Sequence, residues 1–398
     1  MMDVHDLKRK VAAIKAEAIA CRRYLHQHPE LSFCEYETSK YIQRYLSKEN
    51  IPFEIVANTG VVAHIVGNKT ISNDAVILRA DIDALPIQEL NESDYDSVFP
   101  NTMHACGHDF HTANLLSVLK ILKEVQHEFA GHIIAVFQPA EEKIPGGAQS
   151  VIASGILEKD SLVIKGVLGI HVSPKIEVGK VGIRGGKFMA SSDEFFITIK
   201  GKGGHGAQPH LNTDPVVIAS QLVISLQQIV SRVANPSIPS VLSIGKFIAN
   251  GATNVIPDVV HLEGTFRTMD EKWREKALEL IVYQICELPK IFGAEVDLEL
   301  RRGYPALIND SNLASDVKDS LIEYLGNVAV DEADIWMAAE DFAYYTQKYP
   351  AVFFLVGIAN ESKGITSELH TPTFKIDEEA FEQSVGGMLY AALKLLEA

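Results

Sequence analysis

The stretch Asn101-Thr-Met-His-Ala-Cys-Gly-His-Asp-Phe-His111 places one thiol and three imidazoles within eight residues. A run typical of a buried strand, residues 75–80, precedes it and ends in the carboxylates Asp81 and Asp83. Helical periodicity follows over residues 112–123. A polar segment between a strand and a helix lies at the carboxyl end of the strand, where α/β sheets hold their ligands. Because Cys and His bind Zn²⁺ and its first-row neighbours, the stretch predicts a metal site, with a His-rich surface loop as the alternative.

Strands and helices alternate on both sides of this stretch. Apolar spacing predicts a helix over residues 3–27, which ends before Pro29, and a short helix after Gly146-Gly147. Further helices are predicted over residues 313–325 and 376–396. Strands are predicted over residues 61–66, 75–80, 131–138, 166–172 and 351–356. This alternation favours an α/β fold with a doubly wound, mixed and largely parallel sheet.

A different order of elements fills the middle of the chain. The predicted strands there cover residues 194–200, 241–248, 259–268 and 296–301, and the predicted helices cover residues 215–233 and 272–292. The order βαββαβ is that of the ferredoxin-like split motif. We therefore expect an inserted ferredoxin-like α+β domain over residues 186–302, and a catalytic domain formed by residues 1–185 and 303–398.

Two adjacent carboxylates, Glu141 and Glu142, follow the strand predicted over residues 131–138. Neighbouring acids repel each other, and a nearby cation removes the repulsion, because one carboxylate can bind it while the other stays free to move protons. A solvated Glu pair before a loop is the alternative. His171 ends the next strand, and His370 lies in a polar loop near the carboxyl terminus.

Five donors are therefore candidates for one centre: Cys106, His108, Glu142, His171 and His370. Three of the segments that carry them directly follow predicted strands of one sheet, so we expect them to meet at its edge. Five ligands exceed the four of one tetrahedral zinc and suit two metals that share a carboxylate and a water. Because paired metals activate water and polarise a carbonyl, the pattern favours a hydrolase.

Composition narrows the possible partners. The chain has 398 residues, is 47% hydrophobic and carries a formal net charge of -16. Because phosphate binding needs a basic face, this charge disfavours a nucleic-acid partner. The longest apolar run, residues 351–359, is too short to cross a membrane, and the amino terminus lacks the apolar segment of a signal peptide. We predict a cytoplasmic protein with no membrane partner, whose four scattered cysteines are reduced.

Six short motifs, weak singly but specific in combination and order, extend along nearly the whole chain. They are His104-Ala-Cys-Gly-His-Asp-Phe-His-Thr-Ala113, Gln138-Pro-Ala-Glu-Glu142, Gly203-Gly-His-Gly-Ala-Gln-Pro-His210, Asn254-Val-Ile-Pro-Asp258, Gly264-Thr-Phe-Arg267 and Glu340-Asp-Phe342. In this combination the chain resembles the N-acyl-amino-acid amidohydrolases, which include hippurate hydrolase, the indole-acetyl-amino-acid hydrolases and N-acetyl-diaminopimelate deacetylase. That family is a branch of the aminoacylase and carboxypeptidase G type of dinuclear metallopeptidases.

The resemblance implies roles for the residues of the predicted centre. The five donors named above fall on the family's metal-ligand positions and would hold two divalent ions, Zn²⁺, Mn²⁺, Ni²⁺ or Co²⁺. Glu141 falls on the position of the general base. Asp83 matches an acid that supports the ligands in the wider group. The ligand His usually found two residues before it is Asp81 here, which leaves the roles of both aspartates open.

The resemblance also implies roles for the inserted domain, as a lid and a dimerisation domain. His205 matches a histidine that stabilises the oxyanion, often across a dimer interface. Asn254 and Arg267 match groups that hold the carboxylate of the amino-acid product, and an Arg fork suits a carboxylate geometrically. The alternatives are a loop histidine, a turn Asn and a surface Arg on a strand. Because the inserted sheet should have an open edge, we expect a homodimer.

The implied activity is metal-dependent hydrolysis of the amide bond of N-acyl amino acids, such as N-acetyl or benzoyl amino acids, to a carboxylate and a free amino acid. Glu141 would take a proton from a metal-activated water and pass it to the departing amine. Three alternatives stay open. They are a dipeptidase or aminopeptidase of the same fold that acts on short peptides, a non-catalytic metal-binding homologue, and a thiol hydrolase that uses Cys106 and His108.

Overall fold

The computed structural model describes residues 3–397, and the chain divides into two compact units. Unit 1 comprises Met1–Gly186, Ile308–Asp334 and Asp341–Ala398, and unit 2 comprises Lys187–Leu307 and Ile335–Glu340. Residues 303–307 and 335–340, which the sequence analysis placed in the catalytic domain, cluster with unit 2. The function of unit 2 as a lid stays a prediction.

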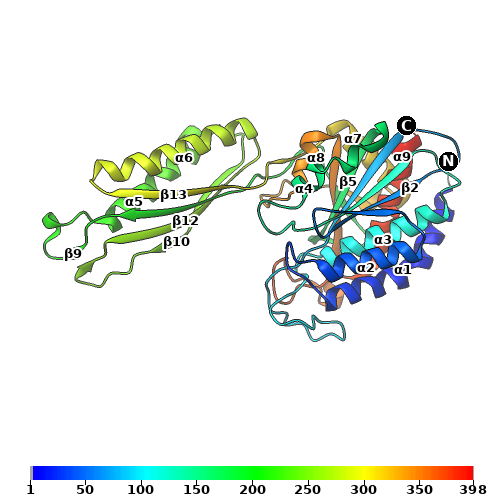
Figure 1. Ribbon diagram of the computed structural model, residues 1–398, viewed down its shortest axis with the longest axis horizontal. Coiled ribbons are helices and arrows are strands. Elements are labelled where there is room, and N and C mark those ends of the chain that lie inside the picture. The colour runs from blue at the N-terminus through cyan, green and yellow to red at the C-terminus, as the bar shows by residue number, and fades with distance from the viewer. Residues whose placement is uncertain (1–2, 398) are drawn as a thin grey trace. The chain divides into compact units, whose positions relative to one another are not determined.

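Unit 1 is built on one mixed sheet of eight strands. In spatial order these are β1 (Phe53–Val56), β2 (Gly60–Val66), β4 (His132–Gln138), β3 (Asp74–Asp81), β5 (Val163–Glu177), β16 (Ala351–Ala359), β6 (Val181–Ile183) and β15 (Val330–Glu332). The central strands β4, β3, β5 and β16 run parallel, whereas β1, β2 and β4 pair antiparallel. The predicted mixed α/β sheet is confirmed, and the carboxyl ends of its parallel strands share one edge (Figure 1).

Long helices bury one face of this sheet. They are α1 (Val4–Gln27), α3 (His108–Glu124), α7 (Ser311–Leu325) and α9 (Phe381–Glu397), whose buried side chains form one core with those of the central strands. The shorter helices of unit 1 are α2 (Tyr36–Lys48), α4 (Ala148–Ala153) and α8 (Ala343–Lys348). The predicted start of the last helix at residue 376 is wrong. Ile376 is buried, and Asp377 caps a short 3-10 turn, Glu378–Ala380, so α9 begins only after it.

Unit 2 has four antiparallel strands in the order β10 (Ser240–Ile248), β12 (Val259–Thr268), β8 (Asp193–Lys200) and β13 (Glu295–Arg302). Two helices, α5 (Pro215–Gln228) and α6 (Glu271–Ile291), pack on one face of this sheet and enclose its core. The connectivity is the predicted βαββαβ order, with β10 and β13 at the edges.

One helical stretch of unit 2, Pro215–Val233, is long and apolar enough to cross a membrane by length and composition alone. A core helix of a soluble protein passes the same test, so this finding is weak by itself. The buried face of α5, with Ile218, Leu222 and Leu226, packs in the core of unit 2. This packing accounts for the apolar side chains of one face, while Val217 and Ile224 on the other face are exposed.

Candidate metal centre

A glycine in the left-handed backbone conformation sets the position of the stretch 101–111. Gly107, with φ of 85°, is the N-cap of α3, and a Cβ there would lie 2.5 Å from Cγ2 of Val172. Only glycine meets both conditions without strain. The helix therefore begins at His108, four residues before the predicted start, so that His108 and His111 lie on its first turn rather than in a loop.

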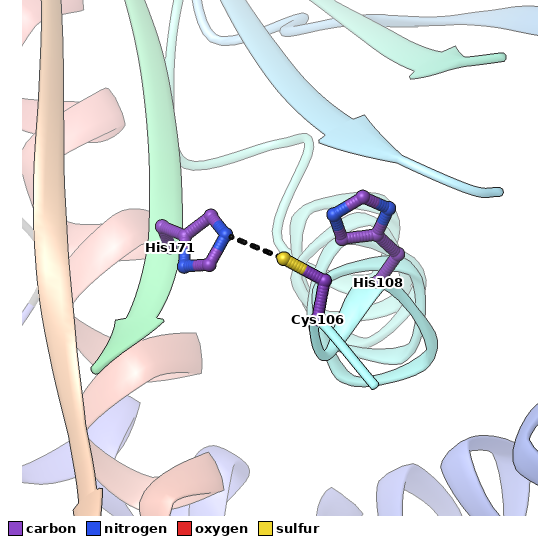
Figure 2. A group of neighbouring side chains, drawn as sticks. All are labelled: Cys106, His108 and His171. Carbon is purple, nitrogen blue, oxygen red and sulfur yellow. Dashed lines mark hydrogen bonds between the residues drawn. The ribbon is translucent and has the colours of Figure 1, made fainter. Parts of the chain in front are cut away.

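Two of the predicted donors lie beside the sulfur atom of a third. The Sγ of Cys106 lies 3.3 Å from Nε2 of His171 and 3.2 Å from Nε2 of His370. His171 comes from β5, whereas Cys106 lies just before α3 (Figure 2). His370 lies in a loop, in the left-handed region with φ of 60°. The structure thus brings together donors that are 264 positions apart in sequence.

The two glutamates after β4 complete the group. The Oε1 of Glu142 lies 3.4 Å from Nε2 of His370 and 3.8 Å from Nε2 of His108. The donor atoms of His108, Glu141 and Glu142 all lie within 4.8 Å of one another. Cys106 and His108 are buried, whereas the side chain of His370 is 52% exposed, so the group opens to solvent on that side.

The group fits divalent metal ions. His108 Nε2 is buried without a hydrogen-bond partner, which is costly unless another ligand such as a cation takes its lone pair. Donor atoms form overlapping sets, each within 4.8 Å: Cys106, His108 and His171; Cys106, Glu142 and His370; His108, Glu141 and Glu142. Overlapping sets of thiol, imidazole and carboxylate suit two first-row ions better than one.

The backbone and Asp83 orient the imidazoles. His108 donates Nδ1–H to Oδ1 of Asp83 at 3.2 Å, and His171 donates Nδ1–H to the carbonyl of Val172 at 2.7 Å. Each ring therefore presents Nε2 to the centre, as metal-binding histidines do. The other oxygen of Asp83 accepts the backbone N–H of Glu142 at 3.0 Å and the hydroxyl of Ser32 at 2.7 Å. Asp83 thus supports two of the candidate ligands at once.

Buried charges change the pKa values of the donors. Burial lowers the pKa of His108, but Asp81 and Asp83 outweigh it and raise the value to about 10. Burial raises the pKa of the Cys106 thiol well above its usual range, and Glu142 and Glu141 raise it further. A nucleophilic cysteine needs a lowered thiol pKa, so this environment disfavours the thiol-hydrolase alternative. Metal binding at this centre must displace protons from Cys106 and His108.

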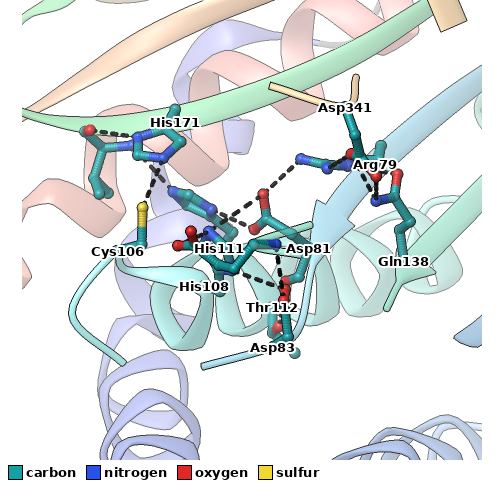
Figure 3. Close-up of polar contacts among 12 residues, drawn as sticks. Arg79, Asp81, Asp83, Cys106, His108, His111, Thr112, Gln138, His171 and Asp341 are labelled. Atoms are coloured by element: carbon teal, nitrogen blue, oxygen red, sulfur yellow. Dashed lines mark hydrogen bonds and ion pairs between the residues drawn. The ribbon is translucent and has the colours of Figure 1, made fainter. Parts of the chain in front are cut away.

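A second layer of buried polar residues lies behind the donors (Figure 3). His111 donates to Asp81, which also pairs with Arg79 at 2.5 Å. Arg79 pairs in turn with Asp341 at 2.7 Å, and Gln138 donates to both oxygens of Asp341. Arg79 was not among the predicted site residues, although a guanidinium within an otherwise apolar strand indicates buried carboxylate partners.

A second buried network was also missed. His26, in the last turn of α1, is 1% exposed and binds Asp109 through Nδ1 at 2.8 Å and Glu89 through Nε2 at 3.0 Å. Arg22 pairs with the same oxygen of Asp109 at 2.7 Å. Asp109 directly follows His108, so this network attaches α1 to the first turn of α3. The signal was Arg22 and His26 four residues apart on one helix, on its buried face.

The candidates in unit 2 fall into two places. His205 is in β9 (Gly204–His205), which pairs with β11 (Val255–Ile256), and Gly206 donates to the carbonyl of Asn254 at 2.8 Å. Arg267 is half-buried and lies at the end of β12 that is remote from β11. Its Nη1 is 3.3 Å from the carbonyl of Met337. From the rise per residue of a β-strand, Arg267 lies about 25 Å from His205 and Asn254 within unit 2. The structure brings His205 and Asn254 together, but not Arg267.

Comparisons with known proteins identify the family. The model of peptidase family M20/M25/M40 matches residues 77–394. N-acetyl-L-cysteine deacetylase of Bacillus subtilis (strain 168) is 39% identical over 98% of this chain and 90% of its own length, and N-acyl-L-amino acid amidohydrolase of Geobacillus stearothermophilus is 41% identical over 77% and 82%. The crystal structure of the Bacillus subtilis YXEP protein, described as a dinuclear metal binding peptidase from the M20 family, is 34% identical, with a TM-score of 0.81 over 97% of this chain and 99% of that one. The predicted resemblance is confirmed: the chain belongs to peptidase family M20/M25/M40 and is a metal-dependent enzyme that hydrolyses amide bonds.

Proposed function

We propose that this enzyme cleaves the amide bond of N-acyl amino acids, releasing a carboxylate and a free amino acid. The observation that carries the proposal is the convergence of five metal donors beside Glu141 at one edge of the unit 1 sheet. The names of the deacetylase and the amidohydrolase that share about two-fifths of their residues with this chain support the N-acyl class. Cys106, His108, Glu142, His171 and His370 would hold two divalent ions of Zn, Mn, Ni or Co.

Divalent ions bound there would supply Lewis acidity, which lowers the pKa of a water and polarises an amide carbonyl. Glu141, beside His108 and Glu142, takes the proton of the attacking water and then delivers it to the departing amine nitrogen. Burial of Glu141, 6% exposed, keeps bulk water from competing for that proton. His205 donates a hydrogen bond to the oxyanion, and Asn254 and Arg267 hold the substrate carboxylate.

This assignment requires a homodimer. His205 and Asn254 lie at the opposite end of the unit 2 sheet from Arg267, too far for one small substrate to contact all three. A second copy of the chain supplies the partner's His205 and the partner's Asn254. Two features of unit 2 support such a pairing, since β10 is an open edge and residues 215–231, which include the exposed Val217 and Ile224 of α5, contain no charged side chain.

The remaining assignments follow the same proposal. The substrate is a small N-acyl amino acid or a short peptide, no nucleic acid takes part because of the charge of -16, and the enzyme acts in the cytoplasm without a membrane partner. A dipeptidase or an aminopeptidase of the same fold would need a group that binds a free substrate amine.

The test is a substrate panel with controlled metal content. The purified enzyme, loaded separately with Zn²⁺, Mn²⁺, Ni²⁺ or Co²⁺, is assayed on N-acetyl, N-benzoyl and indole-acetyl amino acids and on unblocked dipeptides. We expect hydrolysis of the N-acyl substrates, its loss after chelation and its return on adding metal back. Activity that survives complete metal removal would eliminate the proposal, and preference for unblocked dipeptides would replace it with the peptidase alternative.

A further inference from the structure

A buried glutamate far from the metal donors in sequence contacts the chain just before the proposed base. Glu35, the residue before α2, is 0% exposed. Its Oε1 accepts the backbone N–H of Ala140 at 2.8 Å and that of Phe33 at 2.9 Å. Its Oε2 accepts the hydroxyl of Thr59 at 2.7 Å. One carboxylate therefore joins three separate segments of unit 1, and one of them is the loop that carries Glu141.

Ala140 needs an external partner because of its conformation. It is in the left-handed region, with φ of 54°, which disfavours any residue with a Cβ. Its N–H is bound to Glu35, and its carbonyl accepts the N–H of Gly147 at 3.1 Å. Ala140 is itself fully buried, so water cannot replace either partner. The hydrogen bond to Glu35 thus offsets the steric cost of the left-handed conformation, which Ala140 would otherwise not keep.

The same loop has a second anchor on the far side of Glu141. The backbone N–H of Glu142 donates to Asp83, the carboxylate that also orients His108. Glu141 lies between the two anchored amides, so its backbone direction depends on both. The anchors serve different groups, because Asp83 supports the candidate ligands Glu142 and His108, whereas Glu35 binds this loop through the residue before Glu141.

We propose that Glu35 is a positioning residue for the reaction: by holding Ala140 in its left-handed conformation, it directs Glu141 toward the substrate. This inference rests on the proposed function of Glu141 as the base. A general base must lie within hydrogen-bond reach of the proton it takes, and a displacement of about 1 Å costs about 100-fold in rate. The contribution of Glu35 is geometric, so an uncharged acceptor of the same shape can replace it.

The first test compares Glu35→Ala with Glu35→Gln in the metal-loaded enzyme. Glu35→Ala removes the acceptor, and we expect kcat to fall about 10- to 100-fold while metal content stays at the parental level. Glu35→Gln keeps an oxygen toward Ala140 and Phe33 and turns its amide toward Thr59. We expect it to retain kcat within about threefold, because hydrogen-bond geometry rather than charge is what Ala140 needs.

A second substitution tests the mechanism itself. Glycine adopts positive φ without steric cost, so Ala140→Gly introduced into Glu35→Ala should restore kcat at least about fivefold. A role of Glu35 in general stability alone would not produce this rescue. The matched control is Thr59→Val, which removes the hydrogen bond to the other oxygen of the same carboxylate. It should lower Tm and leave kcat within about twofold.

The outcomes separate this inference from the function on which it rests. If the parental enzyme hydrolyses no amide in the panel, or if Glu141→Gln is fully active, the proposed function fails. If the parent is active and Glu141→Gln is not, a folded, metal-loaded Glu35→Ala with parental kcat overturns the role of Glu35. A loss of bound metal that matches the loss of kcat would also overturn the role of Glu35, and so would the absence of rescue by Ala140→Gly. Should Glu35→Ala not fold, Glu35→Asp keeps the buried charge but withdraws the carboxylate by one methylene, and parental kcat in that variant overturns the role.

Discussion

His111 donates from Nδ1 to Asp81 over 2.6 Å and accepts the backbone N–H of Val172 at Nε2 over 3.0 Å. Both ring nitrogens are therefore occupied, and the third imidazole of the central motif supports the site without facing it (Figure 3). Burial lowers the pKa of His111, which agrees with a neutral ring that has one donor and one acceptor. Asp81, whose role the sequence left open, is an anchor shared by His111 and Arg79.

Replacing Asp81 by Asn should destabilise unit 1. Arg79 would lose the carboxylate of Asp81, and the side chains of both residues are completely buried. Breaking a buried pair from one side costs about 3–5 kcal/mol in the free energy of unfolding. Urea unfolding of the metal-loaded enzyme measures this loss, and Asp74→Asn at the start of the same strand is the control. Equal stability of the two variants would show that the Arg79 network has no such role.

Metal retention should depend on Cys106 and not on Cys34. Cys106 lies between two imidazoles at 3.2 and 3.3 Å, whereas the thiol of Cys34 is exposed. We expect Cys106→Ser to weaken metal binding by about 10- to 100-fold or more, since a hydroxyl is a poor ligand for borderline ions. Cys34→Ser should bind as the parent does. Competition with a chromogenic chelator measures both affinities, and identical values would remove Cys106 from the ligand set.

Glu141→Gln should separate chemistry from metal binding. The amide keeps the shape of the side chain but cannot take a proton, so kcat should fall about 10²- to 10⁴-fold. Metal content, measured by mass spectrometry of the desalted protein, should stay at the parental level, because the five donors are intact. A variant that loses a metal along with its activity would indicate that Glu141 is a ligand and would transfer the role of base elsewhere.

The sequence was sufficient to predict the fold and the site wherever local pattern and sheet topology determine them. Parallel strands end at one edge, so the segments beside Cys106 and Glu142 could be predicted to converge there. His171 was predicted at the end of its strand, but β5 continues to Glu177, so His171 lies within the strand. The start of α3 was placed too late because only the φ of Gly107 and its contact with Val172 explain it. Buried charges such as Arg79 could not be placed because their partners are set by tertiary packing, with Asp341 262 positions away.

The stability of the network around His26 should depend on pH. Burial and Arg22 lower the pKa of His26, but Asp109 and Glu89 outweigh them, so its pKa is raised above 6.5 in the folded protein. A raised folded-state pKa means that the protonated ring stabilises the fold below pH 6.5, and that this contribution is lost as pH rises through the folded-state pKa. His104, also buried nearby, has its pKa lowered to about 4, mainly by burial, and adds no proton in this range.

The measurement compares His26→Gln with the parent by urea unfolding at several pH values. At pH 6 the variant should lose about 1.5–3 kcal/mol in the free energy of unfolding, the range for hydrogen bonds to charged groups. The difference should shrink as the pH is raised to 9. His28→Gln, at a half-buried position directly after the same helix, should change it by less than about 0.5 kcal/mol. A loss that grows with pH would contradict the assigned charge of His26.

Subunit mixing tests whether His205 acts across a dimer interface. Glu141→Gln lacks the base but supplies an intact His205, whereas His205→Ala has the base and lacks the oxyanion donor. If the partner's His205 completes each site, a mixed dimer contains one complete site of two, and random exchange should restore about a quarter of parental activity. The matched control mixes His205→Ala with Asn254→Ala, since these residues lie together in unit 2 and no mixed site has both. Activity in the control mixture alone, or in neither mixture despite proven exchange, would place His205 in the site of its own chain.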